Sequence, residues 1–240
     1  MQAIILAAGV GSRMKPLTDN TPKSLLKVGQ KTILGRMVEN ILKVGFKDIA
    51  IVTGYLEDQI KEYTKKNFPN TKFTFIRNDN YETTNTGYSL MLTKIFAQGD
   101  NFIKFDADVV FEKRVLEKLV KSPHKSCLCI DKNIHLEAEE VKVIADPNDK
   151  VIAVGKKLDH NKASGESIGI EKLDPKAGKI LFEELERLMQ DEANYKEYYD
   201  DSYTTLVEKG VSFHAVDITG LKWVEIDTHQ DYQKAQQLFS

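Results

Sequence analysis

The sequence predicts an α/β fold, a doubly wound and mostly parallel sheet with a small antiparallel lid. In the first half, short apolar runs alternate with helical patterns of roughly 10–15 residues, which is typical of parallel strands joined by crossover helices. The first apolar run breaks directly into a glycine loop. After residue 126 short strands follow one another with turns between them, a pattern that favours antiparallel pairing.

The first strand and its loop form the most informative stretch. Residues 3–8 are continuously apolar, and Gly9 and Gly11 follow at once. Because glycine has no Cβ, backbone N–H groups in such a loop can cradle a phosphate. Arg13, Lys15 and Lys23 carry positive charge that could neutralise a bound polyphosphate. An ordinary strand-to-loop turn is the alternative interpretation.

Two common phosphate-binding motifs are absent from this loop. The P-loop requires Gly-x-x-x-x-Gly-Lys-Ser/Thr, which the sequence lacks. The dinucleotide-binding motif requires a third glycine where Met14 stands.

The remaining elements of the first half follow from periodicity and caps. Thr32 is placed to cap a helix that ends near Gly45, with Leu34, Met37 and Ile41 on its apolar face. The other predicted elements are strands at 48–54 and 73–76 and helices at 55–67 and after 89, the last with apolar positions Leu90, Leu92 and Ile95.

The segment 78–89 is a polar loop rich in amides and hydroxyls, a composition suited to reading the edge of a base. It could instead be a long polar loop that caps the following helix through Thr86 or Ser89.

Residues 102–111 read as one buried strand that ends in Asp106 and Asp108. Two acids beside apolar neighbours are costly without compensation, and Mg²⁺ binds carboxylates together with substrate phosphates. The alternative is an N-cap for the helix expected from Lys113.

The second half contains predicted strands at 126–130, 141–144, 151–154 and 167–170, which should form the antiparallel extension and lid. Cys127 and Cys129 are expected to be buried thiols, because Cys-x-Cys without a second pair makes a poor zinc site. Lys156 and Lys157 could bind a phosphate or simply be solvated.

Towards the end, a helix begins at Asp174, strands cover 211–218 and 223–228, and a helix covers 230–239. Between them, residues 195–203 contain four tyrosines and several acids, which suits an ammonium group. The same residues could equally pack a helix against the sheet.

Bulk composition limits the classes of function. The 240 residues include 34 Lys and Arg against 36 Asp and Glu, a net charge of −2, which argues against nucleic acid or an anionic membrane as a partner. The sequence has no membrane-spanning apolar run and no signal pattern, so a cytoplasmic protein is expected. A single domain over 1–240 is predicted, with a first half at 1–125 and a second half, which carries the lid, at 126–240.

Three stretches carry a family resemblance. Residues 6–18 and 22–25 resemble the signature Leu-Ala-Ala-Gly-x-Gly-x-Arg-x-x-Pro-Leu-Thr…Pro-Lys-x-Leu of nucleotidyltransferases that join a nucleoside triphosphate to a phosphorylated sugar or alcohol. Asn-Thr-Gly-Tyr-Ser at 85–89 and Trp-Val-Glu-Ile-Asp-Thr at 223–228 are similar to bacterial cytidylyltransferases for phosphocholine or inositol phosphate. The resemblance extends over nearly the whole chain.

The resemblance implies roles for individual residues. Lys23 and Arg13 would be catalytic, and Asp108 and Asp227 would hold Mg²⁺. The predicted nucleotide site consists of Leu6, Ala8, Gly9, Gly11, Ser12, Arg13, Asn85, Gly87 and Ser89. The predicted acceptor site consists of Tyr88, Glu166, Tyr199, Asp200, Tyr203, Trp223 and Glu225.

The predicted reaction is transfer of CMP from CTP to a small phosphorylated alcohol, with phosphocholine favoured, Mg²⁺ as cofactor and pyrophosphate as product. Two alternatives stay open. One is a sugar-1-phosphate nucleotidyltransferase that uses UTP, dTTP or GTP, and the other is an inactive regulatory subunit of the same fold. The sequence does not fix the oligomeric state, and a homodimer is one option.

Overall fold

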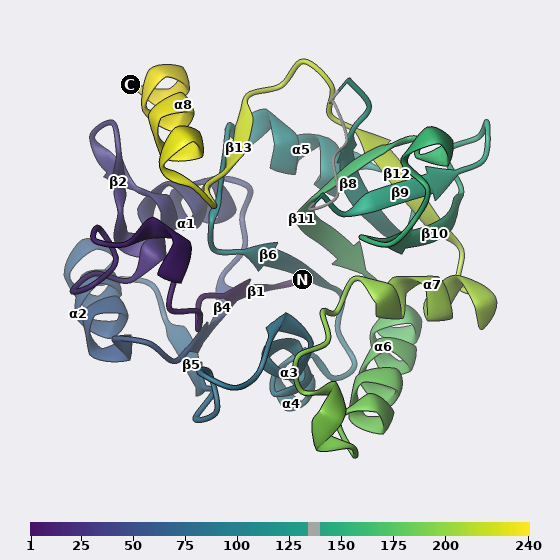
Figure 1. Ribbon diagram of the computed structural model, residues 1–240, viewed down its shortest axis with the longest axis horizontal. Helices are drawn as coiled ribbons and strands as arrows, with labels where there is room; N and C mark the ends of the chain where they lie inside the picture. Colours follow the sequence, from purple (N-terminus) through teal and green to yellow (C-terminus); the bar gives the residue numbers. More distant parts are fainter. Residues whose placement is uncertain (134–139) are drawn as a thin grey trace.

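The computed structural model describes residues 1–133 and 140–240, and its elements surround one large sheet (Figure 1). The central strands are β1 (Gln2–Leu6), β4 (Asp48–Thr53), β5 (Phe73–Arg77) and β6 (Phe102–Asp106). They are parallel and lie in the order β6-β1-β4-β5. The strands β1, β4 and β6 read as nearly continuous apolar runs because both of their faces are covered.

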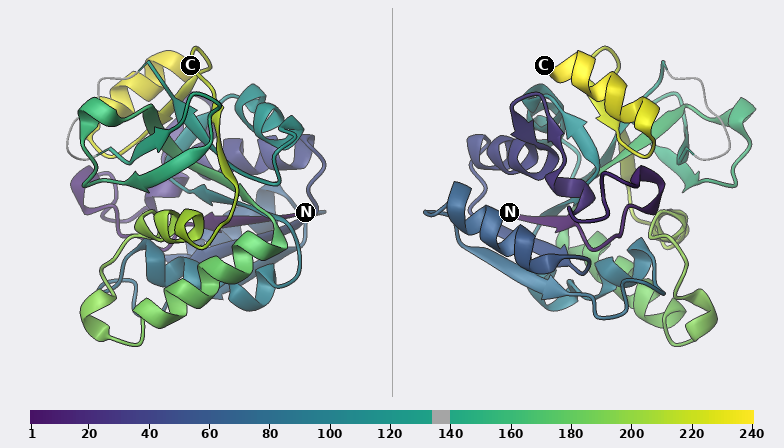
Figure 2. Two further views of the ribbon diagram at one scale, coloured as in Figure 1. Left: turned by 90° about the vertical axis from the view of Figure 1, so that its right-hand side faces the viewer. Right: turned by 60° about the vertical axis from the view of Figure 1, so that its left-hand side comes forward.

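Two layers of helices cover the sheet. Helices α1 (Ile33–Lys43), α2 (Glu57–Asn67) and α5 (Lys113–Lys121) contribute to one hydrophobic core. Helices α3 (Thr86–Met91), α4 (Lys94–Ala97), α6 (Pro175–Leu188) and α7 (Asp201–Glu208) contribute to the other. Along β1, Ala3 and Ile5 face the first core, whereas Ile4 and Leu6 face the second. The left view of Figure 2 shows α5 and α6 on opposite sides of the sheet, and the predicted doubly wound fold class is confirmed.

The second half of the chain extends the same sheet. Its strands are β8 (Ser126–Asp131), β9 (Lys142–Ala145), β10 (Val151–Gly155), β11 (Gly165–Leu173) and β12 (Phe213–Asp217). Strand β11 runs antiparallel to β6, β8 and β9, as the sequence predicts. Strands β8 and β12 are parallel to each other, however, because helices α6 and α7 lie between them in the chain.

The prediction of one strand over 102–111 is wrong. After β6 the chain turns through Ala107 and Asp108 into the short strand β7 (Val109–Phe111). Strand β7 leaves the main sheet and pairs antiparallel with β13 (Trp223–Glu225). Asp106 therefore ends a strand of the main sheet, whereas Asp108 lies in the turn between two sheets.

The single helix expected after residue 89 is also wrong. The chain forms two short helices, α3 and α4, and Ile95 on α4 is 88% exposed rather than inward. Asn85 caps α3, so neither Thr86 nor Ser89 takes that role. Residues 195–200 contain no regular helix, and α7 begins only at Asp201.

A third, smaller core lies beside the first loop. Helix α8 (His229–Phe239) packs there with the hairpin of β2 (Lys27–Val28) and β3 (Lys31–Thr32). Short 3₁₀ helices occur at Ser12–Met14, Lys23–Leu25, His160–Lys162 and Glu192–Asn194. Thr228 and Asp231 form a capping box at the start of α8.

Several local predictions agree with the structure. Thr32 caps α1, and Asp174 caps α6 with Pro175 at its first turn. Cys127 and Cys129 are buried free thiols. Within the described ranges, no helix is both long enough and apolar enough to span a bilayer.

Candidate active site

The glycine loop begins at the carboxyl edge of the central strands. Leu6 of β1 pairs in register with Asp106 of β6, so the loops after both strands leave from the same edge. Gly11 has a left-handed backbone (φ 65°) where the chain enters a 3₁₀ helix. A Cβ at Gly11 would lie only 3.0 Å from Cβ of Lys23, so a glycine here allows the loop to approach Lys23.

The backbone of this loop keeps donors available. No backbone carbonyl in the described part of the chain accepts a hydrogen bond from the N–H groups of Gly9, Gly11 or Ser12. Unpaired N–H groups in a glycine loop, with Arg13 and Lys23 beside them, form a site suited to a polyanion.

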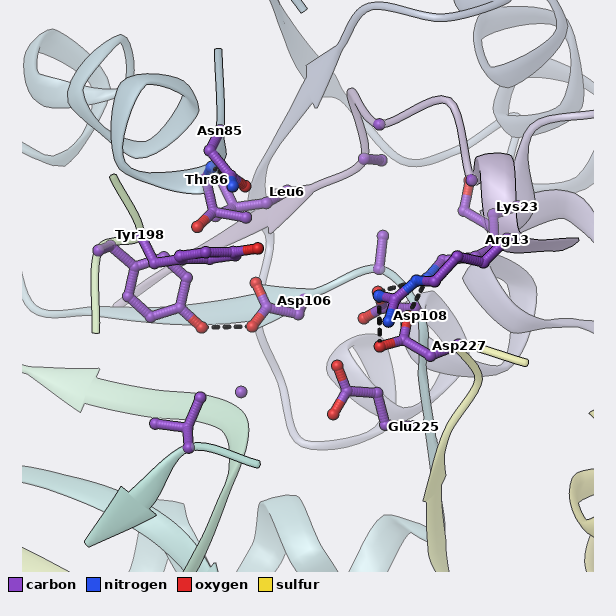
Figure 3. A pocket seen from close by; sticks show the side chains of 18 of the residues that line it. Leu6, Arg13, Lys23, Asn85, Thr86, Asp106, Asp108, Tyr198, Glu225 and Asp227 are labelled. Carbon is purple, nitrogen blue, oxygen red and sulfur yellow. Dashed lines mark hydrogen bonds and ion pairs between the residues drawn. The ribbon is translucent and has the colours of Figure 1, made fainter. Parts of the chain in front are cut away.

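Lys23 joins two carboxylates that come from distant parts of the chain. Its Nζ lies 2.8 Å from Oδ2 of Asp108 and 2.8 Å from Oδ1 of Asp227. Arg13 donates to the other oxygen of Asp227 at 2.7 Å, and Figure 3 shows these contacts as one connected group. Burial disfavours the charged form of Lys23, but the two carboxylates outweigh it, so the pKa of Lys23 lies above its usual value.

Three carboxylates lie close enough to hold a metal ion. Asp108, Glu225 and Asp227 offer oxygens that all lie within 4.8 Å of one another. Oδ1 of Asp108 is buried and has no hydrogen-bond partner among the described residues. Burial, followed by the charges of Asp108 and Asp227, raises the pKa of Glu225 well above its usual value. An oxygen-only set with an unpaired buried oxygen fits Mg²⁺, which favours such ligands.

The opposite wall of the site is made of buried polar groups. Oδ2 of Asp106 accepts a hydrogen bond from the hydroxyl of Tyr199 and lies 3.0 Å from Nζ of Lys104. Oδ1 of Asp106 and Oδ1 of Asp200 are buried without a partner in the described ranges. Burial raises the pKa of Asp200 to about 7. Tyr198 lies next to this wall and is 40% exposed.

The glycine loop, the clustered carboxylates and the opposite wall line one pocket of about 300 Å³, and Lys104 lies outside its lining. Members of the predicted site that line it are Leu6, Gly9, Gly11, Ser12, Arg13, Lys23, Asn85, Asp108, Tyr199, Asp200, Glu225 and Asp227. Residues that the predicted site omits but that also line the pocket include Ser24, Thr86, Asp106, Lys156, Ser167 and Tyr198. In Figure 3, Arg13, Lys23, Asp108, Glu225 and Asp227 occupy one end, whereas Tyr198, Asp106, Asn85 and Thr86 occupy the other.

Four predicted nucleotide or acceptor residues do not line this pocket. The carbonyl of Ala8 accepts from Tyr55 N–H at 3.1 Å. Gly87 and Ser89 are buried in α3, where the side chain of Ser89 accepts from Asn78 at 3.0 Å. The ring of Tyr88 packs against Tyr195 with centroids 5.0 Å apart. Gly87, Tyr88 and Ser89 belong to α3 and make these contacts away from the pocket lining.

Three further predicted acceptor residues also lie outside the pocket lining. Tyr203 is fully buried in the second core, and Trp223 donates to Asp131 at 2.8 Å. Glu166 is 5% exposed within β11. The expected cage of several tyrosines is therefore not assembled, and the aromatic surface at this end comes from Tyr198 and Tyr199.

Sequence signals for the omitted residues were weak. Lys156 belongs to a lysine pair and places its ammonium 4.4 Å from the ring centre of Tyr198. Thr86, whose buried hydroxyl has no partner in the described part of the chain, looked like a helix cap. Only the packing of the chain distinguishes a pocket-lining hydroxyl from a capping one.

A glycine loop, two cationic side chains and clustered carboxylates at the carboxyl edge of an α/β sheet form a site suited to a phosphorylated ligand. A family model described as nucleotidyl transferase matches residues 2–239, and the chain belongs to that family. The resemblance found in the sequence is thereby confirmed.

Cytidylyltransferases are among the similar proteins. CTP:phosphoglutamine cytidylyltransferase of Campylobacter jejuni is 29% identical over 97% of this chain and 98% of its own length. Choline-phosphate cytidylyltransferase of Streptococcus pneumoniae is 28% identical over 99% of this chain and 98% of its own. The solved structure of CTP:phosphocholine cytidylyltransferase from the same species superimposes with a TM-score of 0.82 at 25% identity, covering 100% of this chain and 99% of that one.

Proposed function

We propose that the protein is a Mg²⁺-dependent cytidylyltransferase that transfers CMP from CTP to a small phosphorylated acceptor and releases pyrophosphate. The observation that carries this proposal is the position of Lys23 between Asp108 and Asp227, at 2.8 Å from each, beside the glycine loop. This arrangement puts the cation and the metal carboxylates where a phosphate oxygen would have to be aligned.

In the proposed reaction an oxygen of the acceptor phosphate attacks the α-phosphorus of CTP, and the bond from that phosphorus to the pyrophosphate oxygen breaks. The attacking oxygen is already anionic, so no general base is needed. Arg13 and the backbone of residues 9–12 would hold the triphosphate, and Lys23 would contact both the α-phosphate and the acceptor phosphate. Asp108, Asp227 and the neighbouring Glu225 would hold Mg²⁺, which neutralises charge on the phosphate oxygens.

The choice of CTP is supported by the loop at Asn85 and by the similar proteins. Asn85 and Thr86 lie in the pocket at the end away from Lys23, with amide and hydroxyl groups suited to a base edge. The similar proteins from Campylobacter jejuni and Streptococcus pneumoniae are cytidylyltransferases by name.

The favoured acceptor is phosphocholine. Asp106 and Asp200 each bring a buried carboxylate oxygen without a described partner to the same end of the pocket. Tyr198 adds a partly exposed ring there. A cation gains from both features, through Coulomb attraction and through contact with the aromatic face. A polyol phosphate would gain little from the ring.

The test is a matrix of four nucleoside triphosphates against phosphocholine, phosphoethanolamine, inositol phosphate, glycerol phosphate and glucose 1-phosphate, read by pyrophosphate release. The expected best pair is CTP with phosphocholine. Dimethylbutyl phosphate, in which carbon replaces the charged nitrogen of phosphocholine, should be a poor acceptor. Preference for UTP or dTTP with a sugar phosphate would overturn the assignment of CTP. A clear preference for inositol phosphate or glycerol phosphate would contradict the proposed cation subsite. Absence of turnover with every pair would favour the alternative of an inactive regulatory subunit.

A further inference from the structure

Beneath the acceptor end of the pocket lies a buried lysine that touches no solvent. Lys104, in the middle of β6, is 0% exposed. Its Nζ lies 2.7 Å from Glu171, 3.0 Å from Asp106 and 3.2 Å from the carbonyl oxygen of Gly169, to which it donates. It also donates to the hydroxyl of Tyr199 and lies 3.7 Å from the centre of that ring. The ammonium thus joins two strands and the segment before α7.

The backbone of β11 is distorted at this point. Its pairing with β8 shifts register between Ser167 and Glu171, and Gly169 within that shift has a left-handed conformation (φ 70°). A Cβ at Gly169 would lie 2.4 Å from Oδ2 of Asp106. The irregularity lets Asp106 approach the strand and brings the carbonyl of Gly169 to Lys104.

Lys104 does not line the pocket, but three of its partners, Asp106, Gly169 and Tyr199, do. Asp106 uses Oδ2 to bind Lys104 and Tyr199, while its Oδ1 has no partner in the described ranges. In this arrangement the lysine fixes one carboxylate oxygen and thereby sets the direction of the other. A buried hydrogen-bonded ion pair has little freedom to rearrange, because any departure leaves an uncompensated charge.

We infer that Lys104 is a positioning residue for the acceptor: from beneath the pocket it holds the wall formed by Asp106 and Tyr199 in the geometry that binds the acceptor. The inference rests on the proposed function for the identity of that ligand. It assigns Lys104 no contact with either substrate. It also separates the two ends of the pocket, since the lysine contacts neither Arg13 nor Lys23.

A second buried lysine supplies a matched control. Lys172 of β11 is 5% exposed and donates to the carbonyl of Ser122 at 3.0 Å, and it does not line the pocket. Lys104→Met and Lys172→Met both remove a buried ammonium from adjacent strands, but only the first releases the pocket wall. A difference in acceptor kinetics between them therefore cannot come from loss of a buried charge alone.

The kinetic test compares the wild type with Lys104→Met, Lys172→Met and the double variant Lys104→Met/Glu171→Gln. The double variant removes one positive and one negative charge, so it keeps the buried cluster in balance if Lys104→Met alone does not fold. We expect Lys104→Met and the double variant to raise the acceptor KM about tenfold or more, the loss typical of a hydrogen bond to a charged group, with the KM for CTP within about twofold. Lys172→Met should leave both KM values unchanged.

A substrate-free measurement keeps this inference separate from the proposed function. Hydrogen exchange of residues 195–204 should become faster in the double variant than in the wild type, with no change in the exchange of α1. If the wild type transfers no nucleotide, the proposed function fails while exchange still decides whether Lys104 holds the wall. Unchanged exchange in 195–204, or an acceptor KM restored by Glu171→Gln in the double variant, would overturn the positioning role and leave a merely structural ion pair.

Discussion

The two ends of the pocket use the same motif, a lysine between two carboxylates, in opposite surroundings. Lys23 lies between Asp108 and Asp227, with side-chain exposures of 17–27% for the three residues. Lys104 lies between Asp106 and Glu171, and the lysine and the glutamate are both fully buried. Side chains on loops form the first group, whereas side chains of paired strands form most of the second.

The difference in burial determines what each group can do. At the Lys23 end, water or a phosphate can replace a carboxylate as the partner of the ammonium, so the ion pairs can exchange when a ligand binds. At the other end Lys104 and Glu171 are fully buried, so breaking their pair leaves a buried charge without compensation. The same pairing therefore serves binding at one end and fixed geometry at the other.

The largest effect that would test this comparison is expected at Asp108, a proposed metal ligand at the Lys23 end. Asp108→Asn should lower kcat on the order of 1000-fold and abolish the response to added Mg²⁺, because it removes a ligand and a charge beside the phosphates. Asp106→Asn should chiefly raise the acceptor KM. Steady-state kinetics over a magnesium titration, with Mn²⁺ binding followed by electron paramagnetic resonance, measure both. If Asp106→Asn were the more damaging for metal binding, the assignment of these two acids would have to be exchanged.

The second-largest effect is expected on removal of Lys23. Lys23→Ala is expected to lower kcat about 100-fold, since a cation that orients the phosphates is worth roughly 3 kcal/mol at the transition state. The fold should change little, and a circular dichroism melt checks this. Lys15→Ala, which removes a lysine from the same loop that pairs only with Asp19 in the described ranges, is the control. Normal turnover in Lys23→Ala would exclude this lysine from the site.

A smaller effect on kinetics is expected at the Lys104 end of the pocket. Gly169→Ala would force a Cβ to within 2.4 Å of Asp106, so we expect the acceptor KM to rise about tenfold. Gly210→Ala is a control for backbone strain alone, because Gly210 also has a positive φ (80°) but a Cβ there would meet no atom within 4 Å. Equal acceptor KM values for the two variants would contradict the close approach as the cause.

The smallest effect concerns stability and pH. Burial, followed by the charges of Glu140 and Asp131, raises the pKa of Glu166 to about 8. Between the usual value of 4.5 and 8 the folded chain holds a proton that the unfolded chain releases, so this contribution to stability is complete below 4.5 and is lost as the pH rises to 8. Glu166→Gln should reduce the fall in Tm between pH 5 and 8.5 by about 2–4 °C.

The control for that measurement is Glu62→Gln, which alters an exposed glutamate of α2. Its Tm should follow the wild type across the same range. Because Glu166 lies outside the pocket lining, Glu166→Gln should also leave kcat/KM nearly unchanged. A fall in Tm as steep as that of the wild type would show that Glu166 titrates normally.

Sequence patterns predicted most of the strands and helices, and the residues that surround the glycine loop, because these signals are local. The loop containing Arg13 and Lys23 follows directly from a strand, and parallel strands bring their carboxyl ends together, which places Asp108 beside it. The sequence also indicates the buried cluster around Lys104, because this lysine interrupts an apolar strand, where a charge requires a partner. Its partners, Glu171 and Tyr199, lie far along the chain, and no local pattern links them.

Sequence patterns could not predict the direction in which each side chain points. Tyr199 and Tyr203 are only four positions apart in a segment rich in tyrosine, yet Tyr199 lines the pocket and Tyr203 fills the core. Trp223 and Glu225 lie on the same face of a short strand, but Trp223 donates to Asp131 while Glu225 joins the metal carboxylates. Such differences are decided by neighbours from distant elements.

The capping box of α8 has a consequence for when the site comes into being. Asp231 accepts hydrogen bonds from the N–H groups of both Asp227 and Thr228, at 3.2 and 2.8 Å, so the start of this helix fixes the backbone of a proposed metal ligand. Asp227 meets Lys23 across a separation of 204 positions in the chain. Until α8 forms, the glycine loop and its lysine are present, but the backbone at Asp227 is not held beside them. The contact between Asp227 and Lys23 therefore depends on the start of α8, although the two residues lie far apart in the chain.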